Sequence, residues 1–428
     1  MGIPDVDAYL DDFSAFVTAS PSSYHAAAEV ARRLEEAGFE RLDELDAWPS
    51  GPGRRVVVRD GAVIAWVQPD GATATTPFRI LGAHTDSPSF KLKPNPSSAA
   101  AGLAQANVEV YGGPLLNSWL DRELRLAGRL STRDGAMHLV ATGPMLRIPQ
   151  LAVHLDRGVN KDGLVLDKQR HVQPIWGVEP VGGEPSDVVA HLAALAGVAP
   201  EHVAGHDVHV VDAAAPARFG RGDVFFASGR MDNLTSVHAG ATALVDTPSD
   251  VDHISVLAAF DHEELGSASR SGASGPFLED VLARIGAGFG ASIEESRRAF
   301  AASWHVSSDA GHAVHPNYPE RHDPVNRPVL GGGTLLKLNA NQRYATDAAG
   351  AALWAAACDA AGVPMQPFVS NNTIPCGSTI GPLTATRLGI RTVDVGPPLL
   401  SMHSARELAH VDDLAALGGA VAAFLAGA

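Results

Sequence analysis

Two adjacent glutamates, Glu263 and Glu264, directly follow an apolar run in the stretch FDHEELGSASRSG, residues 260–272. With Asp261 and His262 before them, three acidic groups and an imidazole occupy four consecutive positions. Holding these groups beside the end of a hydrophobic strand costs free energy unless a cation pairs with them. The stretch therefore predicts a bound cation, and the question is which other residues hold it and what each glutamate does.

Carboxylates and imidazoles follow several other apolar segments in the same way. RILGA precedes His84 and Asp86, ASGRM precedes Asp232, HISVLAAF precedes Glu263 and Glu264, WHVSS precedes Asp309 and His312, and TVDVGPPLLSM precedes His403. Ligands of open α/β sheets bind beyond the carboxyl ends of the strands. Five such strand ends predict one shared metal site.

The residue types indicate which metal chemistry is available. Imidazole and carboxylate suit zinc, manganese or cobalt. Two histidines and three carboxylates exceed what one catalytic zinc needs, whereas two divalent ions bridged by one carboxylate use them all and activate a water for hydrolysis. In His84-Thr85-Asp86, we expect Asp86 to accept the free ring N–H of His84 and fix its tautomer.

Other candidates have simpler interpretations. Asp232 by itself is more typical of a helix N-terminal acid than of a metal ligand. His253, His262 and His305 lie within or beside predicted strands and are interpreted as structural. Cys376 has no positioned base in the sequence, which argues against a nucleophile.

Composition narrows the class of protein. The chain has 428 residues, 45% of them hydrophobic, which favours two globular domains. Its formal net charge of −16 argues against a nucleic-acid partner, and any acidic substrate would need a local cation. Only two cysteines occur, so a reducing compartment fits. We see neither a secretory signal nor an apolar segment of membrane-spanning length, and expect a cytoplasmic protein.

The secondary structure that must position these residues follows two patterns, one of mixed helices and strands and one of short strands. Residues 4–40 predict two helices, with Ser20-Pro21-Ser22-Ser23 as a stop and a fresh N-cap, followed by strands within 54–84. From about Phe90 to Gly220 short alternating stretches predominate, with a hairpin signal at Arg133-Asp134-Gly135. A β/α rhythm returns after about Val224. The pattern predicts an α/β domain interrupted by a β-rich domain.

Motifs along almost the whole chain resemble one known family. SPSSYH, GAHTDSPSFKLKPNP, IPQLAVHL, SGRMDNL, FDHEELGS, SSDAGHAVHPNY, LKLNANQRYAT, PCGSTIGP and SMHSARE occur in that order. Together they resemble the aspartyl aminopeptidases, the metallopeptidase family that includes vacuolar aminopeptidase. The resemblance implies a zinc-peptidase-like α/β/α domain with a central mixed sheet (residues 1–90 and 221–428), interrupted by a β-rich oligomerisation or lid domain (91–220). It also implies removal of N-terminal Asp or Glu from peptides.

The same resemblance implies a dinuclear zinc site. His84 and Asp309 would bind one ion, His403 and Glu264 the other, with Asp232 bridging and Glu263 as general base. The bond between Asp232 and Asn233 would be cis. On an extended strand end the two glutamates would point in different directions, so that Glu264 binds metal while Glu263 faces the water.

Substrate contacts are implied as well. Lys337 would hold the acidic side chain of the substrate, unless it forms only a structural ion pair, and Tyr344 and His312 would add contacts. His154, in the inserted domain, would reach the active site of a neighbouring subunit. The family forms tetrahedral dodecamers built from dimers, and the resemblance implies the same here.

Other functions are compatible with part of these sequence features. The metal pair also fits a carboxypeptidase, a deacylase or an aminopeptidase that prefers neutral residues such as leucine. A non-enzymatic assembly protein is a third possibility, but the complete set of ligands and the general base argue against it.

Overall fold

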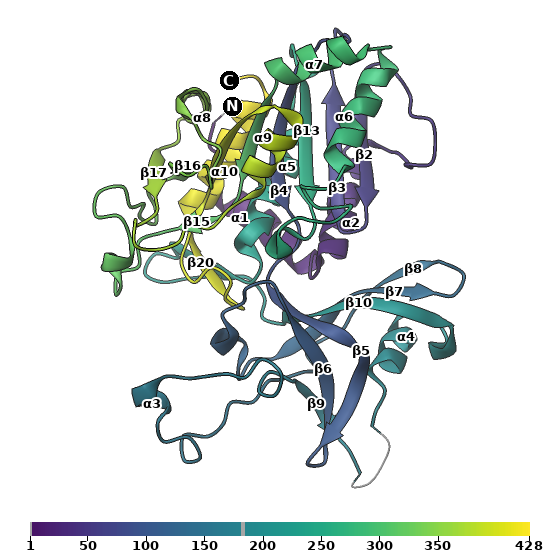
Figure 1. The fold of residues 1–428 in the computed structure, drawn as a ribbon, viewed down its shortest axis with the longest axis vertical. Helices are drawn as coiled ribbons and strands as arrows, with labels where there is room; N and C mark the ends of the chain where they lie inside the picture. Colours follow the sequence, from purple (N-terminus) through teal and green to yellow (C-terminus); the bar gives the residue numbers. More distant parts are fainter. Residues whose placement is uncertain (1, 181–184) are drawn as a thin grey trace.

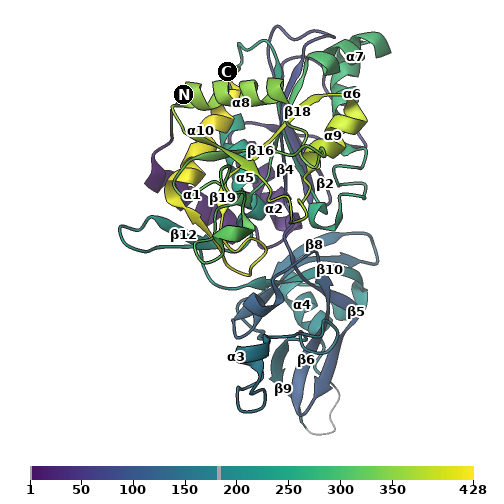
Figure 2. The same cartoon turned by 60° about the vertical axis from the view of Figure 1, so that its left-hand side comes forward.

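The computed structural model describes residues 2–180 and 185–428, which form a larger and a smaller lobe (Figures 1 and 2). Within these residues the larger lobe is built on a nine-stranded sheet. In spatial order its strands are β1 (Glu40–Arg41), β2 (Gly53–Arg59), β3 (Ala62–Gln68), β13 (Ile254–Phe260), β4 (Phe78–His84), β14 (Trp304–Ser308), β18 (Arg391–Gly396), β16 (Thr334–Leu338) and β17 (Met365–Val369).

Four neighbouring strands at the centre of this sheet run parallel. β13 pairs with β4, β4 with β14, and β14 with β18, whereas β2–β3, β3–β13 and β16–β18 are antiparallel. The central strands are nearly continuous apolar runs, and every residue of β13 is buried, as expected for a sheet covered on both faces. Their carboxyl ends therefore meet at one edge.

Helices cover both faces of the nine-stranded sheet (Figure 1). One face packs α1 (Val6–Ala19), α2 (Ser23–Glu36), α5 (Met231–Val245), α8 (Ala348–Ala361) and α10 (Val411–Leu425). The other packs α6 (Phe277–Gly288), α7 (Ile293–Ala302) and α9 (Ile380–Leu388). The predicted α/β/α architecture with a central mixed sheet is confirmed. Ser20 ends α1 and Ser22 caps α2, as the sequence predicted.

The smaller lobe contains a six-stranded sheet in the described part of the chain. Its order is β8 (Met137–Ala141), β7 (Leu124–Thr132), β10 (Val203–Asp212), β5 (Ser89–Ala100), β6 (Leu103–Tyr111) and β9 (Ile175–Val178). β7 and β8 form the predicted hairpin around Arg133–Gly135. The lobe also holds the helices α3 (Val159–Asp162) and α4 (Val188–Ala196).

The two faces of β7 and β10 differ in character, as the alternation of side chains along strands requires. Leu126 and Val210 on one face pack with Leu192 of α4 in an apolar core. On the opposite face, Arg129 and Asp207 are direct cross-strand partners. This polar face is turned toward the larger lobe.

Ion pairs on the polar face join the lobes. The Arg129 guanidinium lies 2.9 Å from Asp60 of the larger lobe and 3.0 Å from Asp207, and it stacks 4.2 Å from the ring centroid of Tyr24. Lys91 approaches Asp207 to 2.7 Å. Although burial raises it, the pKa of Asp207 is lowered to about 2 by the hydrogen bonds and charges of Lys91 and Arg129.

Two small sheets complete the larger lobe. β11 (Ala217–Phe219), β12 (Phe225–Ser228) and β20 (Glu407–His410) form one, and β15 (Gly311–His312) and β19 (Pro398–Leu399) form the other. The strand that precedes Asp232, β12, lies outside the central sheet and pairs with β20. Among the described residues, no helix combines the length and the apolar character that crossing a membrane requires.

Candidate metal centre and active site

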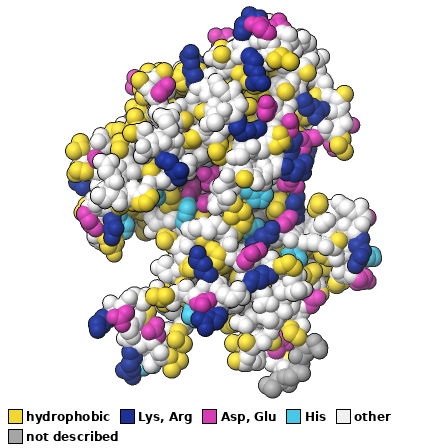
Figure 3. Space-filling view, in the orientation of Figure 1, with side chains coloured by type: hydrophobic (Ala, Val, Ile, Leu, Met, Phe, Trp, Pro, Cys, Tyr) yellow, Lys and Arg dark blue, Asp and Glu magenta, His cyan; other side chains and the backbone are white. Residues whose placement is uncertain are grey.

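The predicted ligands converge at the edge where the central parallel strands end. His84 is the last residue of β4, Glu264 follows β13, Asp309 follows β14, and His403 lies beyond β18 and β19. Asp232 enters from the start of α5. Acidic and histidine side chains gather in the hollow between the lobes (Figure 3). The fold thus places residues more than three hundred positions apart, such as His84 and His403, at one site.

Asp232 lies between the two histidines. Its Oδ1 is 3.3 Å from His84 Nε2, and its Oδ2 is 3.3 Å from His403 Nε2. Asp309 Oδ1 lies 3.8 Å from His84 Nε2, and Glu264 Oε2 lies 3.5 Å from His403 Nε2. The site therefore has two halves that share one carboxylate.

The donor set fits a pair of divalent metal ions. Each half supplies three donor atoms within 4.8 Å of one another, in the groups His84–Asp232–Asp309 and Asp232–Glu264–His403. Asp232 Oδ1 and Glu264 Oε1 are buried and have no hydrogen-bond partner among the described residues. Buried carboxylate oxygens without partners are costly, and a cation would satisfy them. Imidazole with carboxylate is the chemistry that zinc, manganese and cobalt accept.

Without a bound metal, the two glutamates and the two histidines of this site have pKa values above their ordinary values. Burial raises the pKa of Glu264 well above its usual value and, together with neighbouring carboxylates, raises that of Glu263 to about 8. Burial lowers the pKa of His403, but Asp232 and Glu264 raise it to about 10. The pKa of His84 is raised in the same way by Asp232, Asp309 and Asp86. Binding of divalent cations should therefore release protons from this site.

Asp86 holds the site together in two ways. Its main-chain oxygen lies 3.0 Å from His84 Nδ1, closer than its carboxylate at 3.5 Å, so the carbonyl is the main acceptor of the ring N–H. The carboxylate instead accepts the backbone N–H groups of Glu263 (3.0 Å) and Glu264 (3.2 Å) and the Tyr111 hydroxyl (2.8 Å). Asp86 thus positions His84 and both glutamates at once.

The glutamate doublet does not lie on an extended strand end, so that expectation was wrong. Residues Glu263–Leu265 form a 3-10 turn, which follows His262 in the left-handed region at φ 63°. Because of this turn, the backbone N–H groups of Glu263 and Glu264 both point to the Asp86 carboxylate. Successive N–H groups of an extended strand would point in opposite directions. Both glutamate carboxylates lie within 4.8 Å of the His84 ring nitrogen.

Some residues of the site were missed by the sequence reasoning. The Glu407 carboxylate accepts the backbone N–H of Asp232 (3.1 Å) and of His403 (2.9 Å), and burial raises its pKa to about 8. The Gly113 carbonyl oxygen lies 3.0 Å from His403 Nδ1. Glu407 lies within SMHSARE, but it does not follow a strand end, so the strand-end rule could not find it. The Gly113 contact is made by a main-chain carbonyl, which no residue type indicates. The bond between Asp232 and Asn233 is cis, as expected.

Three of the four predicted substrate contacts line a cleft of about 450 Å³ in front of the metal ligands. His312, Lys337 and Tyr344 all face it. Lys337 is only 1% exposed, donates to the Ala310 carbonyl at 2.7 Å, and lies 5.5 Å from the Tyr344 ring centroid. No carboxylate of the described residues lies within 4 Å of its ammonium. An internal ion pair for Lys337, the alternative interpretation, is therefore absent from the described residues.

The other histidines considered in the sequence analysis do not line the cleft. His154 is exposed in the smaller lobe and does not line the cleft of its own chain. His253 Nε2 lies 2.9 Å from the Leu425 carbonyl, His262 Nδ1 lies 2.9 Å from Ser269 Oγ, and His305 is fully buried in β14. The structural interpretation of these three histidines is confirmed.

Known proteins resemble the chain over its full length. Residues 16–425 match the family described as aminopeptidase I zinc metalloprotease (M18). A probable M18 family aminopeptidase 2 of Streptomyces avermitilis is 56% identical over 425 residues, which cover 98% of both chains. A chain in the cryo-EM structure of the Ape4 and Nbr1 complex matches with a TM-score of 0.94 and 34% identity, over 100% of this chain and 88% of that one. The S. cerevisiae mApe1 dodecamer matches with a TM-score of 0.85 and 27% identity, over 98% and 96%.

Together with the fold and the site, the family match defines a hydrolase of the zinc metalloprotease class. The chain belongs to the M18 family and is a metallo-aminopeptidase.

Proposed function

We propose that this protein removes N-terminal aspartate or glutamate from peptides by a two-metal mechanism. The observation that carries the substrate preference is Lys337, a buried ammonium in the cleft that has no carboxylate partner among the described residues. A buried cation without a counter-ion is unfavourable, and an acidic side chain of the substrate would supply that counter-ion. It explains how a chain of net charge −16 would select an acidic residue.

The metal ligands follow from the two halves of the site. His84 and Asp309 would hold one ion, His403 and Glu264 the other, and Asp232 would contact both, because its two oxygens face different histidines. When bound, two divalent ions lower the pKa of a water and polarise the scissile carbonyl. Zinc, manganese and cobalt all suit these ligands.

Glu263 would act as the general base. It lines the cleft, and Asp86 fixes its backbone. Its carboxylate would take the proton of the attacking water and pass it to the leaving amine nitrogen, so that the proton is conserved over the cycle. His312 would donate toward the oxyanion that forms in between, and Tyr344 would form the wall of the pocket beside Lys337.

We also infer that the active protein is a homo-oligomer, a tetrahedral dodecamer. One support is the mApe1 dodecamer, whose chain has the same fold. A second is the stretch around His154, where Leu151, Val153 and Leu155 are 59%, 49% and 75% exposed. Another subunit that covers these side chains would place His154 at a subunit boundary, and we infer that it contributes to the neighbouring cleft there. Residues 91–220 would then be the oligomerisation or lid domain.

Matched substrates test the preference. The zinc-loaded enzyme would be assayed with aspartyl, asparaginyl and leucyl reporter substrates. Because asparagine keeps the shape of aspartate but lacks its charge, we expect kcat/KM for the aspartyl substrate to exceed both others by about 10²-fold. Faster cleavage of the leucyl substrate would overturn acidic selectivity and favour the neutral aminopeptidase. Failure to cleave any of the three would overturn the reaction itself.

A further inference from the structure

Asp394 is a buried carboxylate beside the cleft, and the proposed mechanism does not use it. It lies on β18, and none of its surface is exposed. The antiparallel pairing of β16 with β18 sets Leu336 opposite Val395. One residue further in this register, Lys337 lies opposite Asp394, and residues in facing positions of a strand pair share one face of the sheet. Lys337 and Asp394 are therefore neighbours on the sheet.

Although they are neighbours, Lys337 and Asp394 bond to different partners. Lys337 Nζ donates to the Ala310 carbonyl at 2.7 Å. The Asp394 carboxylate accepts the backbone N–H of Ala345 at 2.6 Å on one oxygen and the hydroxyl of Thr379 at 2.5 Å on the other. Neutral donors therefore engage both oxygens of this carboxylate, and the ammonium stays available to a ligand of the cleft.

The two donors to Asp394 belong to the walls of the cleft. Thr379 lines the cleft itself, and Ala345 directly follows Tyr344, which also lines it. Both segments lie outside the helices and strands, one between β16 and α8 and the other between β17 and α9. The Asp394 backbone N–H adds a third bond, to the Thr346 hydroxyl at 2.9 Å. Asp394 thus connects two irregular wall segments to the central sheet.

The first turn of α9 approaches the same carboxylate closely. Thr379 directly precedes this helix, and Gly381 lies in its first turn. A Cβ added to Gly381 would lie 2.5 Å from both carboxylate oxygens of Asp394. Only glycine therefore leaves room for the carboxylate here, where a negative charge near the N-terminus of a helix is favourable.

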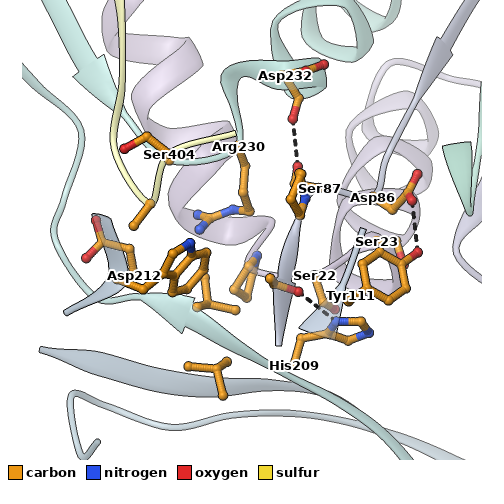
Figure 4. Close-up of a pocket in the computed structure, with 18 of the residues that line it drawn as sticks. Ser22, Ser23, Asp86, Ser87, Tyr111, His209, Asp212, Arg230, Asp232 and Ser404 are labelled. Carbon is orange, nitrogen blue, oxygen red and sulfur yellow. Dashed lines mark hydrogen bonds between the residues drawn. The ribbon is translucent and has the colours of Figure 1, made fainter. Parts of the chain in front are cut away.

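Asp86 has the same bonding pattern on the metal side of the cleft. Its carboxylate accepts two backbone N–H groups, from Glu263 and Glu264, and the hydroxyl of Tyr111 (Figure 4). Asp394 likewise combines a backbone N–H with a hydroxyl. A buried polar network whose members are all bonded makes the segments that it joins rigid. One carboxylate therefore fixes the glutamates, and the other fixes the opposite wall.

We propose that Asp394 is a positioning residue for the side-chain pocket beside Lys337. It holds Tyr344 and Thr379 in place before the substrate binds, and its own bonds keep it from acting as the counter-ion of Lys337. This inference rests on the proposed function and extends it. Walls that are ordered in advance reduce the cost of binding, whereas Asp86 and Glu407 hold the metal ligands independently. Loss of Asp394 should therefore affect KM more than kcat.

Two variants of Asp394 test this role in the zinc-loaded enzyme. Asp394→Ala removes both side-chain bonds, so we expect KM for the aspartyl reporter to rise about 10-fold and kcat to stay within about 3-fold of the wild type. Asp394→Asn can still accept from Ala345 with its oxygen and can donate to the Thr379 hydroxyl with its amide. It should therefore keep KM within about 3-fold of the wild type. Equal losses in both variants would assign the effect to charge and overturn the positioning role.

Asp413 provides a matched control. It is also fully buried and accepts two backbone N–H groups, from Gly331 at 2.7 Å and Gly333 at 2.8 Å, but it lies outside the cleft. Asp413→Ala should lower the Tm and leave KM unchanged. If Asp394→Ala behaves in the same way, Asp394 serves stability alone and the proposal fails.

Further measurements separate this inference from the proposed function. A wild type that cleaves the leucyl reporter faster than the aspartyl one would overturn the acidic preference, but Asp394→Ala should still raise KM for the preferred reporter. If Asp394→Ala does not fold, Gly381→Ala decides, because its Cβ would displace the Asp394 carboxylate while that residue is retained. It should raise KM in the same direction, and an unchanged KM would overturn the proposal.

Discussion

The two sides of the segment Arg230–Asp232 leave different kinds of buried polar atom without partners in the described residues. On the cleft side, carboxylates outnumber the histidines and two carboxylate oxygens lack partners in the described residues. On the other side, arginine and tryptophan donors lack acceptors among those residues. A third region, the ion-paired interface around Asp207, balances its charges internally. The comparison teaches that converging carboxylates without partners indicate a cation site, whereas charges that are already paired contribute to stability.

The largest effect should come from removing the carboxylate shared by both halves of the metal site. Asp232→Ala should lose bound metal and, with it, essentially all turnover, because each half would keep only two donors. Elemental analysis of the purified protein measures the metal directly. Asp250→Ala, a change at an exposed position, serves as the control. Full metal content in Asp232→Ala would contradict the bridging role.

The second largest effect should distinguish the role of Glu263 from that of Glu264. Glu263→Gln should keep its metal but lose about 10²–10⁴-fold in kcat, since it removes the proton acceptor. Glu264→Gln should instead lower the metal content. Kinetics and elemental analysis of both variants distinguish the roles. Near-normal activity of Glu263→Gln would exclude it as the general base.

The cation of the cleft should control selectivity rather than folding. Lys337→Met should lower kcat/KM for aspartyl substrates by about 10²-fold, the loss expected for a charged hydrogen-bonded contact, and should affect leucyl substrates much less. Its free energy of unfolding should not fall much, because no internal ion pair is broken. If aspartyl and leucyl substrates lose activity equally, Lys337 does not select the acidic side chain.

The smallest effect is expected at the ion-paired interface around Asp207. Asp207 has a folded pKa of about 2, below its ordinary 3.8, so its ion pairs stabilise the fold above about pH 4 and lose this effect as the pH falls toward 2. Because the side chain is 32% exposed, Asp207→Asn should cost only about 1 kcal/mol at pH 7. Urea unfolding should show the two proteins converging below pH 4, whereas exposed Asp70→Asn should match the wild type at every pH. A difference that persists at pH 2 would contradict this linkage.

Much of the site was predictable because strand ends are visible in sequence. His84, Glu264, Asp309 and His403 each lie at or beyond the end of an apolar run, and parallel strands bring the residues at their carboxyl ends to one edge of the sheet. Asp232 was found by the same rule, although its strand lies in a different sheet. The turn at Glu263 was not predicted, because a left-handed His262 has no reliable sequence signal.

The sequence by itself determined the residue types available for metal binding, the α/β/α class and the order of the elements, since these depend on local periodicity and on strand-end positions. Only the tertiary structure decided which buried charges are compensated. Arg125 and Arg129 look alike in the sequence, yet Arg129 pairs with two carboxylates and Arg125 pairs with none in the described residues. Compensation depends on contacts between lobes and between distant strands, and no local pattern encodes those distances.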